Sequence, residues 1–344
     1  MTFSGARFCE ARVWYVFSQI AHKDDFDAAF YLPYAQGSNL TRRMPLFVKP
    51  KAKLTLDDAH ALLSHHFQGS FFDPATDVGA GAEHSPYRWN GLAWQSAGGQ
   101  TYVNERVVGV HYTAWHFVTE LREHLPKPMG ALMHWGADDH SWAPKIPVHG
   151  GAAAVHASYD DHDCTSRDAC RRAHGLPGTV TNFSWESAWW VNQVVADQVY
   201  TRKDRAAPVV LAARAALHDK LAQALTKAEA HAVKLFSAGN ASAATGILSD
   251  HAVAAGALAT ATWKALWQEL IVTFVDGKTL TADPKNEVCG CEKASATFTD
   301  EWKAKVIADA GDHYRKPNDD AVAVGKPLHG KPTRDKLTIR GVAP

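Results

Sequence analysis

The sequence has no excess of charge of either sign and no long apolar run. Lysine plus arginine and aspartate plus glutamate number 36 each, so no net field favours binding to nucleic acid or to an anionic membrane surface. The alanine-rich stretch 252–261 is flanked by His251 and Lys264. It is shorter than the roughly 18 consecutive apolar residues that a membrane helix needs. We therefore expect neither a nucleic-acid partner nor a membrane span.

Cysteine is scarce, and the five residues are too few for a disulfide-rich scaffold. Cys164 and Cys170 share one polar stretch, and Cys289 and Cys291 form a CGC. Neither pair has the CxxC spacing of a structural zinc site, and the 19 histidines include no HExxH. We predict no cofactor, and we predict a disulfide between Cys164 and Cys170 if the compartment is oxidising.

The compartment itself stays open. Residues 1–10 contain no apolar run that would serve as a secretion signal, although an upstream segment could carry one. A disulfide between Cys164 and Cys170 would indicate a secretory or endolysosomal protein, whereas free thiols would indicate a cytoplasmic one.

Both ends of one short helix can be predicted from the sequence. Thr55 can cap it, Asp58 stands three residues later as a capping-box variant, and Gly69 follows the last apolar position, Phe67. The spacing predicts a helix over 56–67, within a first hundred residues that otherwise contain strand-like runs.

The middle of the chain has the pattern of strands and a loop. Aromatic-rich runs at 112–120 and 130–136 are too short for packed helices and flank a proline-rich turn at 125–128, so we predict two antiparallel strands. Residues 150–180 are rich in Gly, Ala, Asp and His without a sustained period, and we predict a loop there.

The C-terminal third has a helical pattern. Apolar residues step by threes and fours from Val210 to Leu235, behind Pro208 and ahead of Gly239. A second helix should run to about Val275, and a third should span 300–310 behind Thr299. Beyond Lys316 the chain is rich in Pro, Gly and Lys, and we expect it to be extended.

Five stretches, taken in order, resemble the dipeptidase A and secernin family. They are KAKLTLDDAHALLSHHFQGSFFDP (51–74), SPYRWNGLAW with YVNER (85–106), LPKPMGALMHWGADD (125–139), FSWESAWWVNQVVADQVYTR (183–202) and LSDHAVAAGALATATWKALWQELIVTFVDG (248–277). The resemblance covers about residues 10–312, and 150–175 is similar to an enlarged insertion.

The resemblance implies the fold of an N-terminal-nucleophile (Ntn) hydrolase. We therefore expect the α+β class, with Ntn-hydrolase-like antiparallel sheets layered with helices, incomplete at the N-terminus, and a helical C-terminal third. The expected organisation is a sheet-rich core over 1–205 with the insertion loop 150–180, a helical part of the same domain over 206–312, and an extended tail over 313–344.

The resemblance also implies cysteine-type dipeptidase chemistry on short peptides. In this family a cysteine thiol attacks the peptide carbonyl while its own α-amino group acts as base, which requires the nucleophile at a chain terminus. That cysteine opens a Cys-Thr-Thr-like segment upstream of the stretch with which this chain begins. We therefore expect the isolated chain to be inactive, and the alternative function is a non-catalytic binding or structural subunit of a larger assembly.

Neither early candidate replaces that nucleophile. Cys9 lies in FCEARVWYV, which is similar to the start of a strand in the middle of the family's sheet, and we expect it to be an apolar filler. Thr2 would be exposed by removal of Met1, but its surroundings lack any sign of the nucleophile strand. If the upstream segment is absent, its neighbouring strands become edges that a partner chain would cover.

Two arginines are candidates for binding a peptide carboxylate. Arg88 in PYRW and Arg106 in NER lie in polar-aromatic clusters, where a guanidinium can form two parallel hydrogen bonds to a carboxylate. The alternative is structural, because each arginine could instead pair with a carboxylate such as Glu105 or stack on Trp89.

Adjacent carboxylates at Asp138 and Asp139 are candidates for binding the peptide's free amino group. They end a predicted strand, where neighbouring side chains point to opposite faces, so we expect only one to face a site. Capping of the following turn is the alternative.

An amide donor and a set of histidines complete the candidates. In FSWESAWWVNQ the tryptophans read as core anchors, while Asn192 or Gln193 could donate to an oxyanion hole. His111 with His116 and His134 with His140 stand five or six residues apart and share no compact strand face. We therefore predict no metal site.

Overall fold

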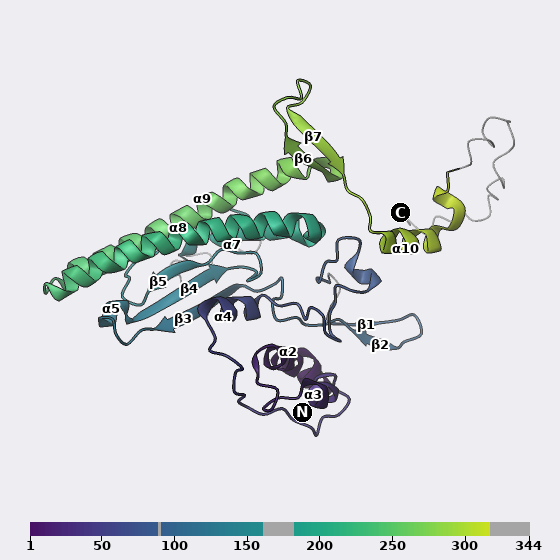
Figure 1. Ribbon diagram of the computed structural model, residues 1–344, viewed down its shortest axis with the longest axis horizontal. Coiled ribbons are helices and arrows are strands. Elements are labelled where there is room, and N and C mark those ends of the chain that lie inside the picture. The colour runs from purple at the N-terminus through teal and green to yellow at the C-terminus, as the bar shows by residue number, and fades with distance from the viewer. Residues whose placement is uncertain (89–90, 161–181, 317–344) are drawn as a thin grey trace. The chain divides into compact units, whose positions relative to one another are not determined.

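The computed structural model describes residues 1–88, 91–160 and 182–316 (Figure 1). The chain divides into two compact units, Met1–Ser295 and Ala296–Pro344. In the second unit, helix α10 (Asp300–Ala310) begins behind Thr299, whose Oγ1 accepts a hydrogen bond from the N–H of Trp302 at 3.2 Å. Both ends of this helix match the sequence prediction.

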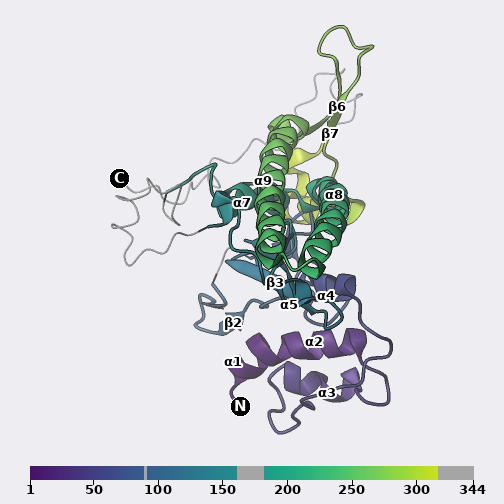
Figure 2. The same cartoon turned by 90° about the vertical axis from the view of Figure 1, so that its left-hand side faces the viewer.

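The chain begins with helices, and the predicted strand at Cys9 is wrong. A π-helical stretch, Ala6–Glu10, leads into α2 (Ala11–Ile20), and α3 (Ala28–Ala35) follows (Figure 2). Aromatic and β-branched residues suggested a strand, but their burial follows helical spacing, because Ala11, Trp14 and Tyr15 all face one apolar cluster. Cys9 is exposed rather than a core filler.

Helix α4 (Leu56–Leu63) has the predicted capping box at its N-terminus. Thr55 Oγ1 accepts from the N–H of Asp58 at 3.1 Å, and Asp58 Oδ2 accepts from the N–H of Thr55 at 2.7 Å. The helix ends four residues before the predicted Phe67, which has a left-handed φ of 65° instead of a helical one and buries its ring in the core.

The main sheet has three antiparallel strands in the order β3-β4-β5. They are β3 (Trp115–Leu121), β4 (Ala131–Ala137) and β5 (Ile146–His149), with Phe117 opposite Trp135 in the register. The two predicted antiparallel strands are confirmed as β3 and β4. A short helix, α5 (Lys127–Gly130), lies in their connection, where the sequence predicted a turn.

Two small hairpins complete the strands of the described residues. They are β1 (Ala93–Gln95) with β2 (Thr101–Val103), and β6 (Lys278–Ala282) with β7 (Cys291–Ser295). The chain is therefore α+β, as predicted, but its sheets are small, in contrast to the expected sheet-rich core over 1–205.

Three helices form the main core with β5. They are α7 (Ala188–Thr201), α8 (Lys203–Ser237) and α9 (Ala241–Thr273), and α8 and α9 run side by side over the sheet (Figures 1 and 2). Trp263 is fully buried among their apolar faces. The long predicted helix starts seven residues before Val210, so Pro208 lies inside it rather than at its first turn.

One face of β3 is open within the described residues. Alternate strand residues share a face, and Trp115, Phe117 and Leu121 are all exposed there, Leu121 to 84%. β3 is also an edge strand of its sheet.

Candidate functional site

The chain turns sharply where β4 ends. Asp138 follows Ala137 and adopts a left-handed φ of 72°, and its N–H donates to the carbonyl oxygen of Ala114 at 2.9 Å. A non-glycine residue in this region is strained, and such strain concentrates at functional sites. Because the strand stops at Ala137, Asp138 and Asp139 do not alternate between two faces, and both carboxyl groups are buried.

Asp139 accepts hydrogen bonds from three separate parts of the chain. Its Oδ2 accepts from the hydroxyls of Tyr200 at 2.9 Å and Tyr87 at 3.2 Å, and its Oδ1 accepts from the N–H of Ser141 at 2.8 Å. Burial raises the pKa of Asp139 to about 6, although the donors oppose that rise. The Asp139 carboxylate thus ties α7, the 85–88 segment and the turn after β4 together.

Tyr87 extends this network. Its hydroxyl oxygen accepts from Trp142 Nε1 at 2.8 Å and lies 2.9 Å from His66 Nε2. The hydroxyl has one proton, and donating it to Asp139 leaves His66 Nε2 to donate to Tyr87. Burial lowers the pKa of His66 to about 3, so the ring is neutral at pH 7 and carries its proton on Nε2.

A cleft of about 320 Å³ borders the network, and Tyr87 is part of its wall. Pockets for small ligands start at about this size. The chain segments that line it are 86–88, 91–92 and 104–112, apart from Arg106, Val108 and Gly109. Both ends of the 85–106 stretch, one of those that carried the resemblance, therefore meet at this cleft.

The two candidate arginines differ in their hydrogen-bond and ion-pair partners. Arg88 lines the cleft, but its Nη2 donates to Asp77 Oδ1 at 2.8 Å and to the carbonyl oxygen of Pro74 at 2.6 Å. Arg106 makes no ion pair within the described residues, and its Nε is buried without a hydrogen-bond partner there. Its guanidinium lies 5.9 Å from the ring centre of Tyr112, a cleft residue.

The Asp138 carboxyl group lacks the partners that Asp139 has. It is 1% exposed, and neither oxygen makes a hydrogen bond within the described part of the chain. Burial, and then the charge of Asp139, raise the pKa of Asp138 well above its ordinary value. The backbone N–H of Asp139 opposes this rise in the pKa of Asp138. Its geometry does not meet the requirements of a hydrogen bond to either Asp138 carboxyl oxygen. Burial of Asp138 therefore favours its protonated form.

Asn192 lies on α7 next to this turn and is 2% exposed. Its Nδ2 donates to the carbonyl oxygen of Ala137 at 3.0 Å, which fixes the end of β4 against α7. Gln193 instead donates to Asp197 Oδ1 at 2.9 Å. The Asn192 amide thus holds the backbone just before Asp138.

A buried basic cluster lies on the other side of the same turn. The ring centres of His116 and His140 are 4.2 Å apart, and His60 lies 6.1 Å from His140. Lys145 is 5% exposed, and its Nζ donates to the carbonyl oxygen of His140 at 3.4 Å. Burial lowers the pKa of Lys145 to about 7 and those of His60 and His116 to about 3.

Sequence reasoning missed Lys145, Tyr87, Tyr200 and His66. Tyr87, Tyr200 and His66 lie in stretches that carried the resemblance, whereas Lys145 does not. None had a local signal for its role, because these roles come from contacts across the fold. Within 1–88, 91–160 and 182–316, no group of three His, Cys, Asp or Glu side chains is placed to hold a metal ion. Cys164 and Cys170, with their predicted disulfide, lie outside the described residues.

The described residues thus form an α+β fold with a buried carboxylate network beside a small cleft, and a comparison with known families identifies the family of the chain. The model of peptidase family C69 matches residues 1–211, more than half of the chain, so the chain belongs to peptidase family C69. This confirms the resemblance to the dipeptidase A and secernin type. No curated protein matches the sequence. No helix in the described ranges is long and apolar enough to cross a membrane.

Proposed function

We propose that this chain supplies the substrate-binding part of a cysteine-type dipeptidase with an Ntn-hydrolase core, in which Asp138 binds the peptide's free amino group. The supporting observation is the strained, buried Asp138 carboxyl group, whose two oxygens have no hydrogen-bond partner in the described residues. Asp139 is less suited to this role, because three donors already occupy it. An ammonium group would satisfy Asp138 and ionise it at once.

Arg106 is the proposed partner of the peptide's carboxylate. Its guanidinium is next to the cleft residue Tyr112 and is free of ion pairs in the described residues, whereas Arg88 is held by Asp77. Recognition of both charged ends distinguishes an enzyme for dipeptides from a general amidase. Because Asp138 is only 1% exposed, side chains between it and the cleft must shift before an ammonium group reaches it.

The nucleophile is not Cys9 in this proposal. Family members place the nucleophile first in a strand with a free α-amino group, whereas Cys9 lies within the π-helical stretch Ala6–Glu10. Cys9 is also exposed, in a part of the chain distinct from the cleft-lining segments.

Binding of an unmodified dipeptide such as Ala-Ala should release a proton into solution at pH 6.5, because Asp138 must ionise. Isothermal titration calorimetry in two buffers of different ionisation enthalpy measures that proton. Asp138→Asn should weaken binding about 30–100-fold, as expected for loss of a charge-assisted pair, and abolish the proton release. Asp197→Asn, a nearby carboxylate paired with Gln193, is the matched control and should change affinity less than about threefold.

Blocked peptides assign each end to its residue. N-acetylation should weaken binding to the unaltered protein but have little further effect on Asp138→Asn, and C-amidation should behave likewise with Arg106→Gln. Arg42→Gln is the control for Arg106, since Arg42 also lies over an aromatic ring, that of Phe30. Equal losses for both blocked peptides in every variant would contradict the assignment.

Substitution Cys9→Ala should leave both dipeptide binding and any dipeptide hydrolysis unchanged. Turnover of Ala-Ala by purified residues 1–344 is the measurement, and we expect binding without turnover above background. Hydrolysis that disappears with Cys9→Ala would show that the nucleophile is misassigned. Binding that stays without hydrolysis, even after a Cys-Thr-Thr-like segment is supplied upstream, would favour the non-catalytic alternative.

A further inference from the structure

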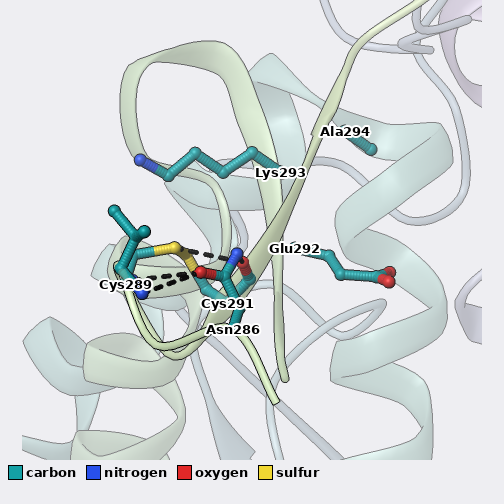
Figure 3. Close-up of a pocket in the computed structure, with 7 residues that line it drawn as sticks. Asn286, Cys289, Cys291, Glu292, Lys293 and Ala294 are labelled. Atoms are coloured by element: carbon teal, nitrogen blue, oxygen red, sulfur yellow. Dashed lines mark hydrogen bonds between the residues drawn. A yellow bond between two sulfur atoms is a disulfide. The ribbon is translucent and has the colours of Figure 1, made fainter. Parts of the chain in front are cut away.

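The β6–β7 hairpin carries a disulfide at its turn. Cys289 and Cys291 are joined across a single residue, Gly290, and their Cα atoms are 5.2 Å apart (Figure 3). Gly290 has a left-handed φ of 63°, a conformation in which most other residues would be strained. The linkage lies outside the dipeptide cleft and has no part in the function proposed above.

The hairpin turn is held by hydrogen bonds that do not depend on this linkage. Asn286 Oδ1 accepts from the N–H groups of Val288 at 3.0 Å and Cys289 at 3.3 Å, and its Nδ2 donates to the carbonyl oxygen of Cys291 at 2.7 Å. The N–H of Gly290 donates to the carbonyl oxygen of Asn286 at 2.7 Å. A disulfide between residues two apart also closes a very small loop, which constrains the unfolded chain little. The disulfide therefore adds little to the stability of the turn.

The linkage is accessible from solvent, and the surface hollow that it lines is also lined by Lys293 and Glu292. Cys289 is exposed and Cys291 is half-buried, and both line a surface hollow together with Lys293. Cys291 and Lys293 are alternate residues of β7, so their side chains lie on one face of the hairpin, with Glu292 on the other (Figure 3). Positive charge near a departing sulfur favours the thiolate.

We propose that Cys289–Cys291 is a redox-active disulfide that exchanges with small-molecule thiols. A thiolate RS⁻ attacks the exposed Sγ of Cys289, the S–S bond breaks, and Cys291 leaves as a thiolate in the hollow that Lys293 also lines. A second RS⁻ attacks the sulfur of R in the mixed disulfide, releasing RSSR and the Cys289 thiolate. Two RSH are oxidised to RSSR, the protein disulfide gains two electrons, and the two protons end on Cys289 and Cys291.

Asn286 allows the disulfide to form again after reduction. Because its hydrogen bonds keep residues 286–291 in the same turn, the two thiols stay close after reduction and can close again. In the reduced state the Cys289 thiol can donate to the carbonyl oxygen of Cys291, which lies 3.0 Å from its Sγ.

The test uses the full chain with Cys9, Cys164 and Cys170 replaced by Ala, so that only the pair remains. The protein is equilibrated in buffers of reduced and oxidised glutathione, and the peptide holding both cysteines is quantified by differential alkylation and mass spectrometry. We expect reversible interconversion across these buffers, with one oxidised glutathione formed per chain reduced. Cys291→Ala should accumulate a mixed disulfide at Cys289. Resistance of the linkage to about 10 mM reduced glutathione for hours would overturn the proposal.

Two controls separate exchange from a structural role. Lys293→Gln should slow reduction about threefold, whereas Lys285→Gln, in the same turn but outside the hollow, should not. Reduction should move the melting temperature by less than about 2 °C, because Asn286 maintains the turn. A larger fall would show that the disulfide is structural and would overturn the proposal, as would thiols that stay reduced in every buffer.

Discussion

Replacement of Lys145 by methionine should raise the free energy of unfolding by about 2–4 kcal/mol at pH 7. Lys145 is 5% exposed, and burial lowers its pKa from the usual 10.5 to about 7. The unfolded chain keeps the proton that the folded chain must partly give up, and that difference costs stability. Methionine has a similar length and carries no charge, so the cost disappears while the packing stays.

The sign of the pH dependence tests this cause. Between about pH 7 and 10.5 the unfolded state binds one more proton at Lys145 than the folded state, so stability of the unaltered chain rises with pH in this window. The advantage of Lys145→Met should therefore shrink as the pH approaches 10.5. Urea unfolding at pH 7 and pH 10 measures both values.

An exposed lysine provides the control. Lys227→Met, on the surface of α8, should change the unfolding free energy by less than about 0.5 kcal/mol at either pH. A loss of stability in Lys145→Met at pH 7 would instead mean that the ammonium group is well solvated or paired in the folded protein.

Removal of the Asp139 side chain, by Asp139→Ala, should lower the free energy of unfolding by about 3–5 kcal/mol. The Tyr87 and Tyr200 hydroxyls and the N–H of Ser141 all donate to this carboxylate, and Asp139 is fully buried. Substitution by alanine leaves these donors in the interior without an acceptor. Chemical denaturation at pH 7 is the measurement.

The neighbouring carboxyl group is the matched control for Asp139. Asp138→Asn should change stability by less than about 1 kcal/mol, because burial favours the uncharged form of Asp138 and its carboxyl oxygens make no hydrogen bond in the described residues. We thus expect the two adjacent residues to have different roles, with Asp139 needed for folding and Asp138 for binding. Similar losses for both variants would contradict this division.

Acid should destabilise the folded chain through its histidines. Burial lowers the pKa values of His66, His60 and His116 to about 3. Below pH 6.5 the unfolded chain therefore binds protons at these histidines that the folded chain does not bind. The free energy of unfolding falls by about 1.4 kcal/mol per pH unit for each such proton. Asp139, with its pKa raised to about 6, acts in the opposite direction between pH 4 and 6. Three histidines outweigh this one carboxyl group.

Local signals in the sequence predicted the helix boundaries best. The Thr55 and Asp58 capping box and the Thr299 cap act within three residues, so no distant contact changes them. The strand expected at Cys9 failed because Trp14 and Tyr15, which are typical of strands, instead pack along one helix face against distant side chains. At this position, burial against distant side chains outweighed the strand propensity of the residues.

The site could be predicted only as a set of residue types. Asp138, Asp139, Arg88 and Arg106 were all found from their chemistry, but their roles depend on partners far away in the chain. Arg88 is occupied by an aspartate 11 residues away, and the Asp139 carboxylate is held by a tyrosine 61 residues away. The Asp139–Tyr200 pairing arises from the packing of α7 on the end of β4, which no local pattern contains.

The open aromatic face of β3 has a consequence for how the protein behaves in solution. The formal net charge at pH 7 is zero, so colloidal repulsion between molecules is weakest there. An edge strand bearing Trp115, Phe117 and Leu121 then meets other copies with little to hold them apart. Solubility should therefore be lowest near neutrality, and purification at a pH one or two units away keeps the chains dispersed.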